Sequence, residues 1–213
     1  MGYRMKGQGP KCLLDINGKH LIEHQIEIIS QVFTRFEVIL VVGFQYLQVR
    51  EVFKQTRNFK MVVNYDFETT NVVKSIGLGL DRAEEKDVVV IYGDLLFNKE
   101  AITAPFGYES VVVLDQLNGM MDKDEVGVVN YKNTATNLMY GLPQKWAQIA
   151  YFTEKELALM KTICKDESFS KCFGFEAINE VIHRGGTFRA VCPQKIKAFD
   201  LDSSADFDKI GLI

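Results

Sequence analysis

Residues 87–94, DVVVIYGD, decide the fold class of this chain. The run 87–92 is short and rich in β-branched residues, as expected of a strand buried on both faces of a sheet. Residues 37–42 (EVILVV) and 60–64 (KMVVN) have the same character. Apolar residues at helical spacing predict helices over 21–33, 47–55 and 71–83. This alternation predicts βαβ units and an α/β fold, with a mostly parallel or mixed central sheet flanked by helices.

The second half of the chain has a less regular pattern. Residues 115–143 are polar, with scattered Asn, Gly and Thr. In the first half, Thr69 or Thr70 is the expected N-cap of the third helix. The remaining predicted elements are strands at 110–114, 126–131, 187–191 and 197–201, and helices over 154–165, 175–183 and 203–210.

Composition excludes several classes of protein. The chain has 213 residues, enough for one domain with a substantial core, and its formal net charge of −3 gives no sign of nucleic-acid binding. The four cysteines form no CxxC pair, so we expect reduced thiols and no zinc site. No apolar run approaches the ~20 residues that cross a membrane, and the N-terminus has no apolar signal region. We therefore expect a cytoplasmic protein with no membrane partner.

One candidate phosphate-binding segment and one candidate metal ligand lie in the first half. Residues 2–11 (GYRMKGQGPK) combine three glycines with Arg4, Lys6 and Lys11. Glycines let backbone N–H groups approach a phosphate closely, and the cations neutralise its charge. Asp94 follows a buried strand, at the edge of the sheet where such folds bind ligands. A flexible tail and a turn-capping aspartate are the plain structural explanations of these two features.

A second pair of acids follows the last predicted strand. Asp200 and Asp202 alternate along it, so their side chains point to opposite faces unless the strand ends between them. We expect one of the two to face the metal and the other to face solvent or cap the final helix. Carboxylates from separate strand ends, together with a glycine-rich cationic loop, suit phosphoryl or nucleotidyl transfer, which depends on positioning and on charge stabilisation.

The order of these motifs resembles a known family. Gly2-x-Arg4-Met5 followed by PKxLL at residues 10–14, TNVVKSI at 70–76, IYGD at 91–94 and FDLDS at 199–203 resemble blocks of the nucleotidyltransferases with a GT-A-like Rossmannoid fold. This group includes sugar-1-phosphate nucleotidyltransferases and CTP:phosphocholine cytidylyltransferases. The resemblance covers essentially the whole chain and implies a single domain over 1–213. Residues 1–110 would be the nucleotide-binding half and 111–213 the acceptor-binding half.

The resemblance also implies roles for individual residues. Arg4 and Lys11 would be catalytic and hold the triphosphate, and Asp94 with Asp202 would bind Mg²⁺. Glu176 and, on a looser match, Lys145 would contact the acceptor. The implied nucleotide-binding residues are Gly2, Arg4, Lys11, Thr70, Asn71 and Gly93.

The implied reaction joins an NTP to a phosphate monoester and releases pyrophosphate. The acceptor would be phosphocholine-like or a sugar 1-phosphate, as in the synthesis of cell-surface polysaccharide or lipid precursors, and homo-oligomers are common in such families. The TNVVKS segment favours the phosphocholine type. Two alternatives remain open: a GT-A glycosyltransferase that uses Asp200-x-Asp202 to hold a nucleotide-sugar, and a non-catalytic nucleotide-binding member of the family.

The sequence departs from the family pattern at its start, since members normally have a strand before the glycine-rich loop. Here Met1 stands where the loop begins, and we expect the true start to lie upstream. His20 and His24 lie four residues apart and could pair, although a solvated helix face is the simpler interpretation. Four aromatic residues could contact a quaternary ammonium group, with core packing as the simpler role: Trp146, Tyr151, Phe173 and Phe175.

Overall fold

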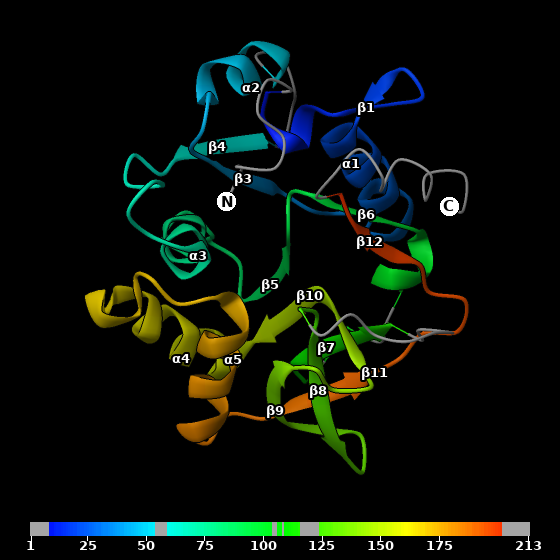
Figure 1. Ribbon diagram of the computed structural model, residues 1–213, viewed down its shortest axis with the longest axis vertical. Coiled ribbons are helices and arrows are strands. Elements are labelled where there is room, and N and C mark those ends of the chain that lie inside the picture. Colours follow the sequence, from blue (N-terminus) through cyan, green and yellow to red (C-terminus); the bar gives the residue numbers. More distant parts are fainter. Residues whose placement is uncertain (1–8, 54–58, 104–105, 108, 116–123, 202–213) are drawn as a thin grey trace.

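The computed structural model describes residues 9–53, 59–103, 106–107, 109–115 and 124–201, and Figure 1 shows its arrangement. It is an α/β fold in which helices flank a mixed central sheet, as predicted. The elements are η2 (Lys11–Leu13), β1 (Asp15–Ile16), β2 (Lys19–His20), α1 (Leu21–Val32), β3 (Val38–Val42), α2 (Tyr46–Phe53), β4 (Phe59–Val63), α3 (Val72–Leu80), β5 (Asp87–Ile91), β6 (Leu95–Phe97), η3 (Lys99–Ile102), β7 (Val111–Asp115), β8 (Val126–Tyr131), β9 (Thr134–Tyr140), β10 (Lys145–Thr153), α4 (Glu154–Lys165), η4 (Glu167–Phe169), α5 (Gly174–His183), β11 (Phe188–Val191) and β12 (Ala198–Asp200).

Within the described residues, the central sheet has six strands in the order β5-β10-β7-β11-β9-β8. Strands β7 and β11 run parallel, whereas the other pairings among these six described strands are antiparallel. Strand β10 lies between β5 and β7, and its first residue also pairs with β8. It therefore joins the first half of the chain to the second.

Three smaller ladders complete the strand pairing in the described residues. Strands β3 and β4 pair in parallel, as the βαβ pattern predicts, with Val38 opposite Phe59. The prediction that β5 would share their sheet is not met in the described residues, because β5 pairs with β10, a strand that sequence reasoning did not identify. Strand β12 pairs with β6 and β1 pairs with β2, both antiparallel.

Apolar side chains cover both faces of the central sheet. Along β7, Val112 and Leu114 pack on one side among side chains of α3, α4 and α5. Val111 and Val113 point to the other side and pack with residues of β6 and η3 and with the far end of α1. All four side chains are almost fully buried. Burial of apolar side chains on both faces of β7 therefore stabilises this part of the molecule.

Several local predictions need correction. Helix α3 is capped by Asn71, whose side-chain oxygen accepts the Val72 N–H, and not by Thr69 or Thr70. Strands β6, β9 and β10 were not predicted, because the segments that form them lack a clear alternating pattern. The predicted closing helix over 203–210 lies outside the described residues. No helix in the described part of the chain is both long and apolar enough to cross a membrane.

Candidate active site

The turn that carries Asp94 joins β5 to β6 and is fixed from two sides. The N–H of Leu95 donates to the Tyr92 carbonyl at 3.2 Å, which closes the turn. From α1, the buried side chain of Gln25 donates to the carbonyls of Tyr92 and Leu95, at 2.9 and 2.6 Å. Because Gln25 satisfies the carbonyls on both sides of Asp94, it holds the turn rigid. Its role is not visible in the sequence, where it occupies an ordinary polar helix position.

Lys11 meets Asp94 across this turn. The lysine Nζ lies 3.0 Å from Oδ2 of Asp94, and the two side chains are 19% and 13% exposed. Lys11 stands at the start of η2, directly after Pro10. The structure thus brings together two of the residues implied by the resemblance, 83 positions apart in the sequence. Because both side chains are mostly buried, water screens this ion pair less than a surface ion pair, and the attraction is stronger.

Asp200 lies beside Asp94 because β12 pairs with β6. Asp200 is the partner of Leu95 in this ladder, and the next N–H, of Leu201, donates to the Asp94 carbonyl at 3.0 Å. The side chain of Gln148, from β10, donates a hydrogen bond to Oδ2 of Asp200. Asp200 therefore faces the site, which sequence reasoning left open. Asp202, Gly2 and Arg4 lie outside the described residues.

Tyr92 connects these carboxylates to α5. Its hydroxyl accepts a hydrogen bond from the backbone N–H of Gly174 and interacts electrostatically with the carboxylates of Asp94 and Asp200. Burial, and then the negative charge of Asp94, raises the pKa of Tyr92 well above its usual range. The hydroxyl therefore keeps its proton at every physiological pH. Its ring packs edge-on against Trp146, with ring centroids 5.8 Å apart.

The loop between β4 and α3 contains the implied nucleotide-binding residues Thr70 and Asn71. Buried Asn64 fastens it by donating to the hydroxyls of Thr70 at 3.3 Å and Ser75 at 3.1 Å, and by accepting the Asp66 N–H. The loop follows the carboxyl end of β4, the edge where ligands bind in such sheets. Among the described residues, no atom lies within 4 Å of the position that a Cβ would occupy at Gly93.

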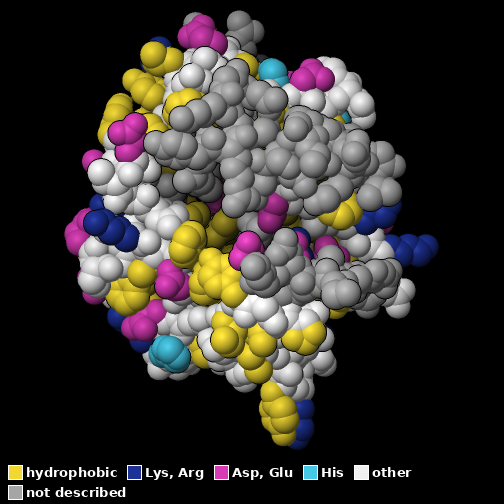
Figure 2. Space-filling view, viewed as in Figure 1, with side chains coloured by type: hydrophobic (Ala, Val, Ile, Leu, Met, Phe, Trp, Pro, Cys, Tyr) yellow, Lys and Arg dark blue, Asp and Glu magenta, His cyan; other side chains and the backbone are white. Residues whose placement is uncertain are grey.

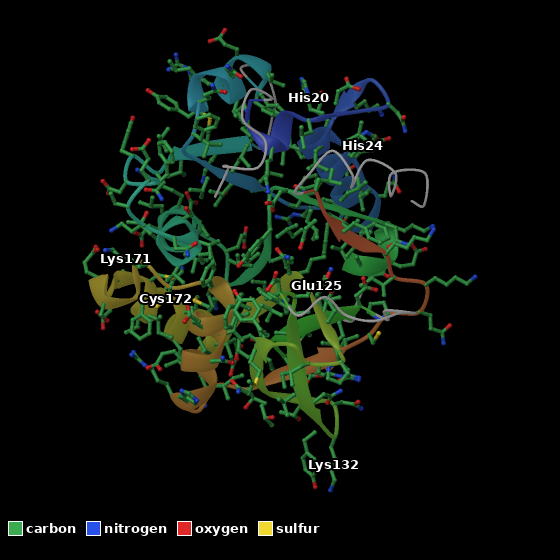
Figure 3. The ribbon with its side chains drawn as sticks, viewed as in Figure 1. His20, His24, Glu125, Lys132, Lys171 and Cys172 are labelled. Atoms are coloured by element: carbon green, nitrogen blue, oxygen red, sulfur yellow. The ribbon has the colours of Figure 1, made fainter. Side chains whose placement is uncertain are left out.

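The two implied acceptor-binding residues have different environments. Glu176 is exposed on the first turn of α5, and its carboxylate accepts the N–H of Phe173 at 2.7 Å, as a helix cap does. Lys145 is buried at the start of β10 and pairs with Glu125, which is labelled near the middle of the view in Figure 3. The Lys145 ammonium group therefore already forms an ion pair with a carboxylate that directly precedes β8.

An exposed aromatic patch lies at the same end of α5. The ring of Phe173 stacks on Phe175 with centroids 6.0 Å apart, and Tyr140 of β9 packs edge-on against Phe175 at 5.2 Å. Phe173 and Tyr140 are each 46% exposed. Figure 2 shows hydrophobic and acidic side chains side by side in the centre of this face. Of the four aromatic candidates, Trp146 and Tyr151 belong to the core, and Phe173 and Phe175 belong to this patch.

The histidines do not form a pair with each other. His20 precedes α1 and donates from Nδ1 to the Leu13 carbonyl at 2.8 Å, while His24 donates from Nε2 to the Ile16 carbonyl at 2.7 Å. Both rings lie on the α1 side of the molecule in Figure 3. They therefore tie the segment after the glycine-rich loop to α1, which corrects the expectation of a solvated helix face.

The described acids suit a magnesium ion that also binds phosphate oxygens. Asp94, in the turn before β6, and Asp200, at the end of the neighbouring β12, offer hard carboxylate oxygens, and the Lys11 ammonium lies against Asp94. Mg²⁺ commonly takes one or two carboxylates and completes its shell with water and substrate phosphates. Within the described ranges no group of three or more His, Cys, Asp or Glu residues could hold a metal ion by itself. The donor set therefore fits a metal that arrives with a nucleotide.

Comparisons with solved structures show the same fold. The inositol-1-phosphate CTP transferase from T. maritima is 16% identical, with a TM-score of 0.79 over 97% of this chain and 88% of that one. The CTP:phosphocholine cytidylyltransferase from Streptococcus pneumoniae is 17% identical, with a TM-score of 0.74 over 98% and 92%. A nucleoside-diphosphate-sugar pyrophosphorylase from Vibrio cholerae is 14% identical, with a TM-score of 0.69 over 94% and 91%.

The sequence itself shows the family. None of the curated proteins matches the chain. The family model for the MobA-like NTP transferase domain matches residues 1–108, just over half of the chain, including Lys11, Gly93 and Asp94. The chain therefore belongs to the MobA-like NTP transferase family and is a nucleotidyltransferase.

Proposed function

We propose that this protein is a Mg²⁺-dependent nucleotidyltransferase that transfers NMP from an NTP to a small phosphate monoester. The observation that carries the proposal is the meeting of Lys11 and Asp94 at 3.0 Å, with Asp200 on the adjacent strand. A cation and two carboxylates converge at the carboxyl end of β5, within a family of NTP transferases. This arrangement favours nucleotidyl transfer over the glycosyltransferase alternative, which has no use for the Lys11 loop.

In the proposed reaction, an oxygen of the acceptor phosphate attacks the α-phosphorus of the NTP in line, and pyrophosphate leaves. Bound Mg²⁺ would supply positive charge against the phosphate oxygens, held by Asp94 together with Asp200 or Asp202. Lys11 would bind phosphate oxygens with its ammonium group, which requires that it turn away from Asp94. Gln25 keeps the Asp94 turn fixed during this exchange, so the carboxylate does not need to reorganise.

The acceptor would bind in the second half of the chain, near α5. The exposed rings of Phe173 and Tyr140, with Phe175 between them, support a phosphocholine-like acceptor over a sugar 1-phosphate, because a quaternary ammonium group is attracted to aromatic faces. The Tyr92 hydroxyl links this patch to the carboxylates. Glu176 would face the same ammonium group. We infer that the protein has no nucleic-acid or membrane partner, and its proposed use of NTPs is the reason to place it in the cytoplasm.

Pyrophosphate release tests this proposal directly. CTP, UTP, dTTP, GTP and ATP would each be combined with phosphocholine and with a panel of sugar 1-phosphates, with and without Mg²⁺. We expect release for one pair, abolished by chelation of the metal and lowered at least 100-fold by Asp94→Asn or Lys11→Met, the loss typical of removing one preorganised charge contact. Lys19→Met, which removes an exposed ion pair with Glu27, is the matched control and should leave the rate unchanged. Full activity in Asp94→Asn would refute the assignment.

A further inference from the structure

Strand β10 contains a bulge next to the candidate active site. Lys145 and Trp146 pair with β7 in register, but the next pairing is Ala150 with Val112, so four steps along β10 oppose two steps along β7. The indole N–H of Trp146 donates to the carbonyl of Ile149 at 3.1 Å and closes the bulge. Bulges of this kind commonly re-aim a side chain beside an active site.

Gln148 stands at the centre of this bulge in an unusual backbone conformation. Its φ is +56°, in the left-handed region that glutamine rarely adopts. The neighbouring Ala147 and Ile149 are almost fully buried, so the packing on both sides holds the backbone in place. Strained positions persist only where the surroundings impose them, and they concentrate at functional sites.

The consequence of this conformation is the contact with Asp200. The Gln148 amide donates to Oδ2 of Asp200, a residue of another sheet that is 52 positions away. Asp200 is the neighbour of the Asp94 turn through the β12–β6 ladder. The bulge thus aims one neutral donor at one of the two described carboxylates of the site.

We propose that Gln148 is a positioning residue that orients Asp200 for binding the metal–nucleotide complex. The inference rests on the function proposed above. An amide N–H fixes a carboxylate oxygen without neutralising its charge, whereas a lysine or arginine would compete with a divalent cation. Lys11 forms an ion pair with Asp94, and Gln148 sets the direction of Asp200 with a donor that carries no charge of its own.

The test uses the full chain with Gln148→Gly, which removes the amide and suits the positive φ, and Gln148→Asn, which keeps an amide and also tolerates this conformation. Lys132→Gly is the matched control, because Lys132 has a φ of +49° at the tip of the β8–β9 hairpin, far from the site (Figure 3). Two quantities would be measured: kcat for pyrophosphate release, and the Kd of Mn²⁺ in the presence of a non-hydrolysable NTP analogue.

We expect Gln148→Gly to keep or raise the melting temperature, to weaken Mn²⁺ binding 10- to 100-fold and to lower kcat by a similar factor. Gln148→Asn should recover part of both losses, and Lys132→Gly should change neither. Unchanged Mn²⁺ affinity in Gln148→Gly would overturn the inference. The inference would also fail if Gln148→Gly and Gln148→Asn both lowered the melting temperature while both kept the wild-type Mn²⁺ affinity. If the wild-type protein binds Mn²⁺ with the analogue but releases no pyrophosphate with any pair, the proposed function fails while the Mn²⁺ comparison still decides the role of Gln148.

Discussion

Replacing Gly174 by alanine should force α5 away from Tyr92 and destabilise the protein. Gly174 begins α5 and is buried, and a Cβ at this position would lie 2.3 Å from the Tyr92 hydroxyl oxygen. An ordinary contact begins at about 3.4 Å, so one group must move by about 1 Å. Tyr92 cannot move freely, because its ring packs against Trp146 and its hydroxyl accepts the Gly174 N–H.

The size of the effect follows from two opposing terms. Overpacking in a dense core costs about 1–3 kcal/mol. Alanine in place of glycine returns up to about 1 kcal/mol in a helix, and less at its first position. We expect a net loss of about 1–2 kcal/mol, which lowers the melting temperature by roughly 2–8 °C in a chain of this length. The Km for the acceptor should rise as well, since α5 carries the aromatic patch.

A double-mutant cycle isolates the cause. Tyr92→Phe removes the hydroxyl, and the next atom, Tyr92 Cζ, would lie at 3.4 Å, an ordinary contact. Gly174→Ala should therefore cost less in the Tyr92→Phe background by about 1 kcal/mol or more, measured by urea denaturation of the four proteins. Gly107→Ala is the control, because no atom of the part of the chain that the structure describes lies within 4 Å of its added methyl group. If Gly174→Ala costs the same in both backgrounds, the hydroxyl is not the obstacle and the reasoning fails.

Asn71→Ala should cost about 1 kcal/mol by removing the cap of α3, while Thr69→Ala, at a position that the sequence also offered as a cap, should be nearly neutral in the same thermal melts. Burial raises the pKa of the Cys164 thiol from 9.0 to about 12, so the folded state keeps a proton that the unfolded chain releases. Stability is complete below pH 9 and falls as the pH rises toward 12; Cys164→Ala should flatten this fall in melts from about pH 8 to 11, and an unchanged slope would contradict it. Glu125→Gln strands the buried ammonium of Lys145 and should cost about 3 kcal/mol, the lower end for a broken buried pair, because the carboxylate is partly exposed. Adding Lys145→Met should recover most of that loss in urea denaturation, and a purely additive double variant would rule out the ion pair as the cause.

The strands of the first half were predictable because burial leaves a direct signature in the sequence. Residues 37–42 and 87–92 are short runs rich in β-branched residues, and each contains a strand of the structure. The turn that follows the second run places Asp94 next to Lys11 and to the β12–β6 ladder. Lys11 was identified from its motif, and its contact with Asp94 agrees with a shared site.

Residues whose role depends on distant contacts were not predictable. Gln25 looks like an ordinary polar position of a helix, but it is 4% exposed and bonds to carbonyls about 70 positions away. Strand β10 was missed because Lys145 and Gln148 interrupt its apolar residues. Lys145 is buried against Glu125, and Gln148 occupies a bulge, so neither obeys the alternation that identifies a strand.

The partners of the two described acids explain how the site can hold like charges close together. Two neighbouring carboxylates repel each other, and burial would strengthen that repulsion unless each had a compensating contact. Asp94 has the Lys11 ammonium against it, and Asp200 accepts a hydrogen bond from the neutral Gln148 amide. A nucleoside triphosphate brings further negative charge, so in the proposed reaction we expect it to enter the site together with a divalent cation. Omitting the metal should therefore weaken binding of the NTP, measured as a higher Kd in the presence of a chelator.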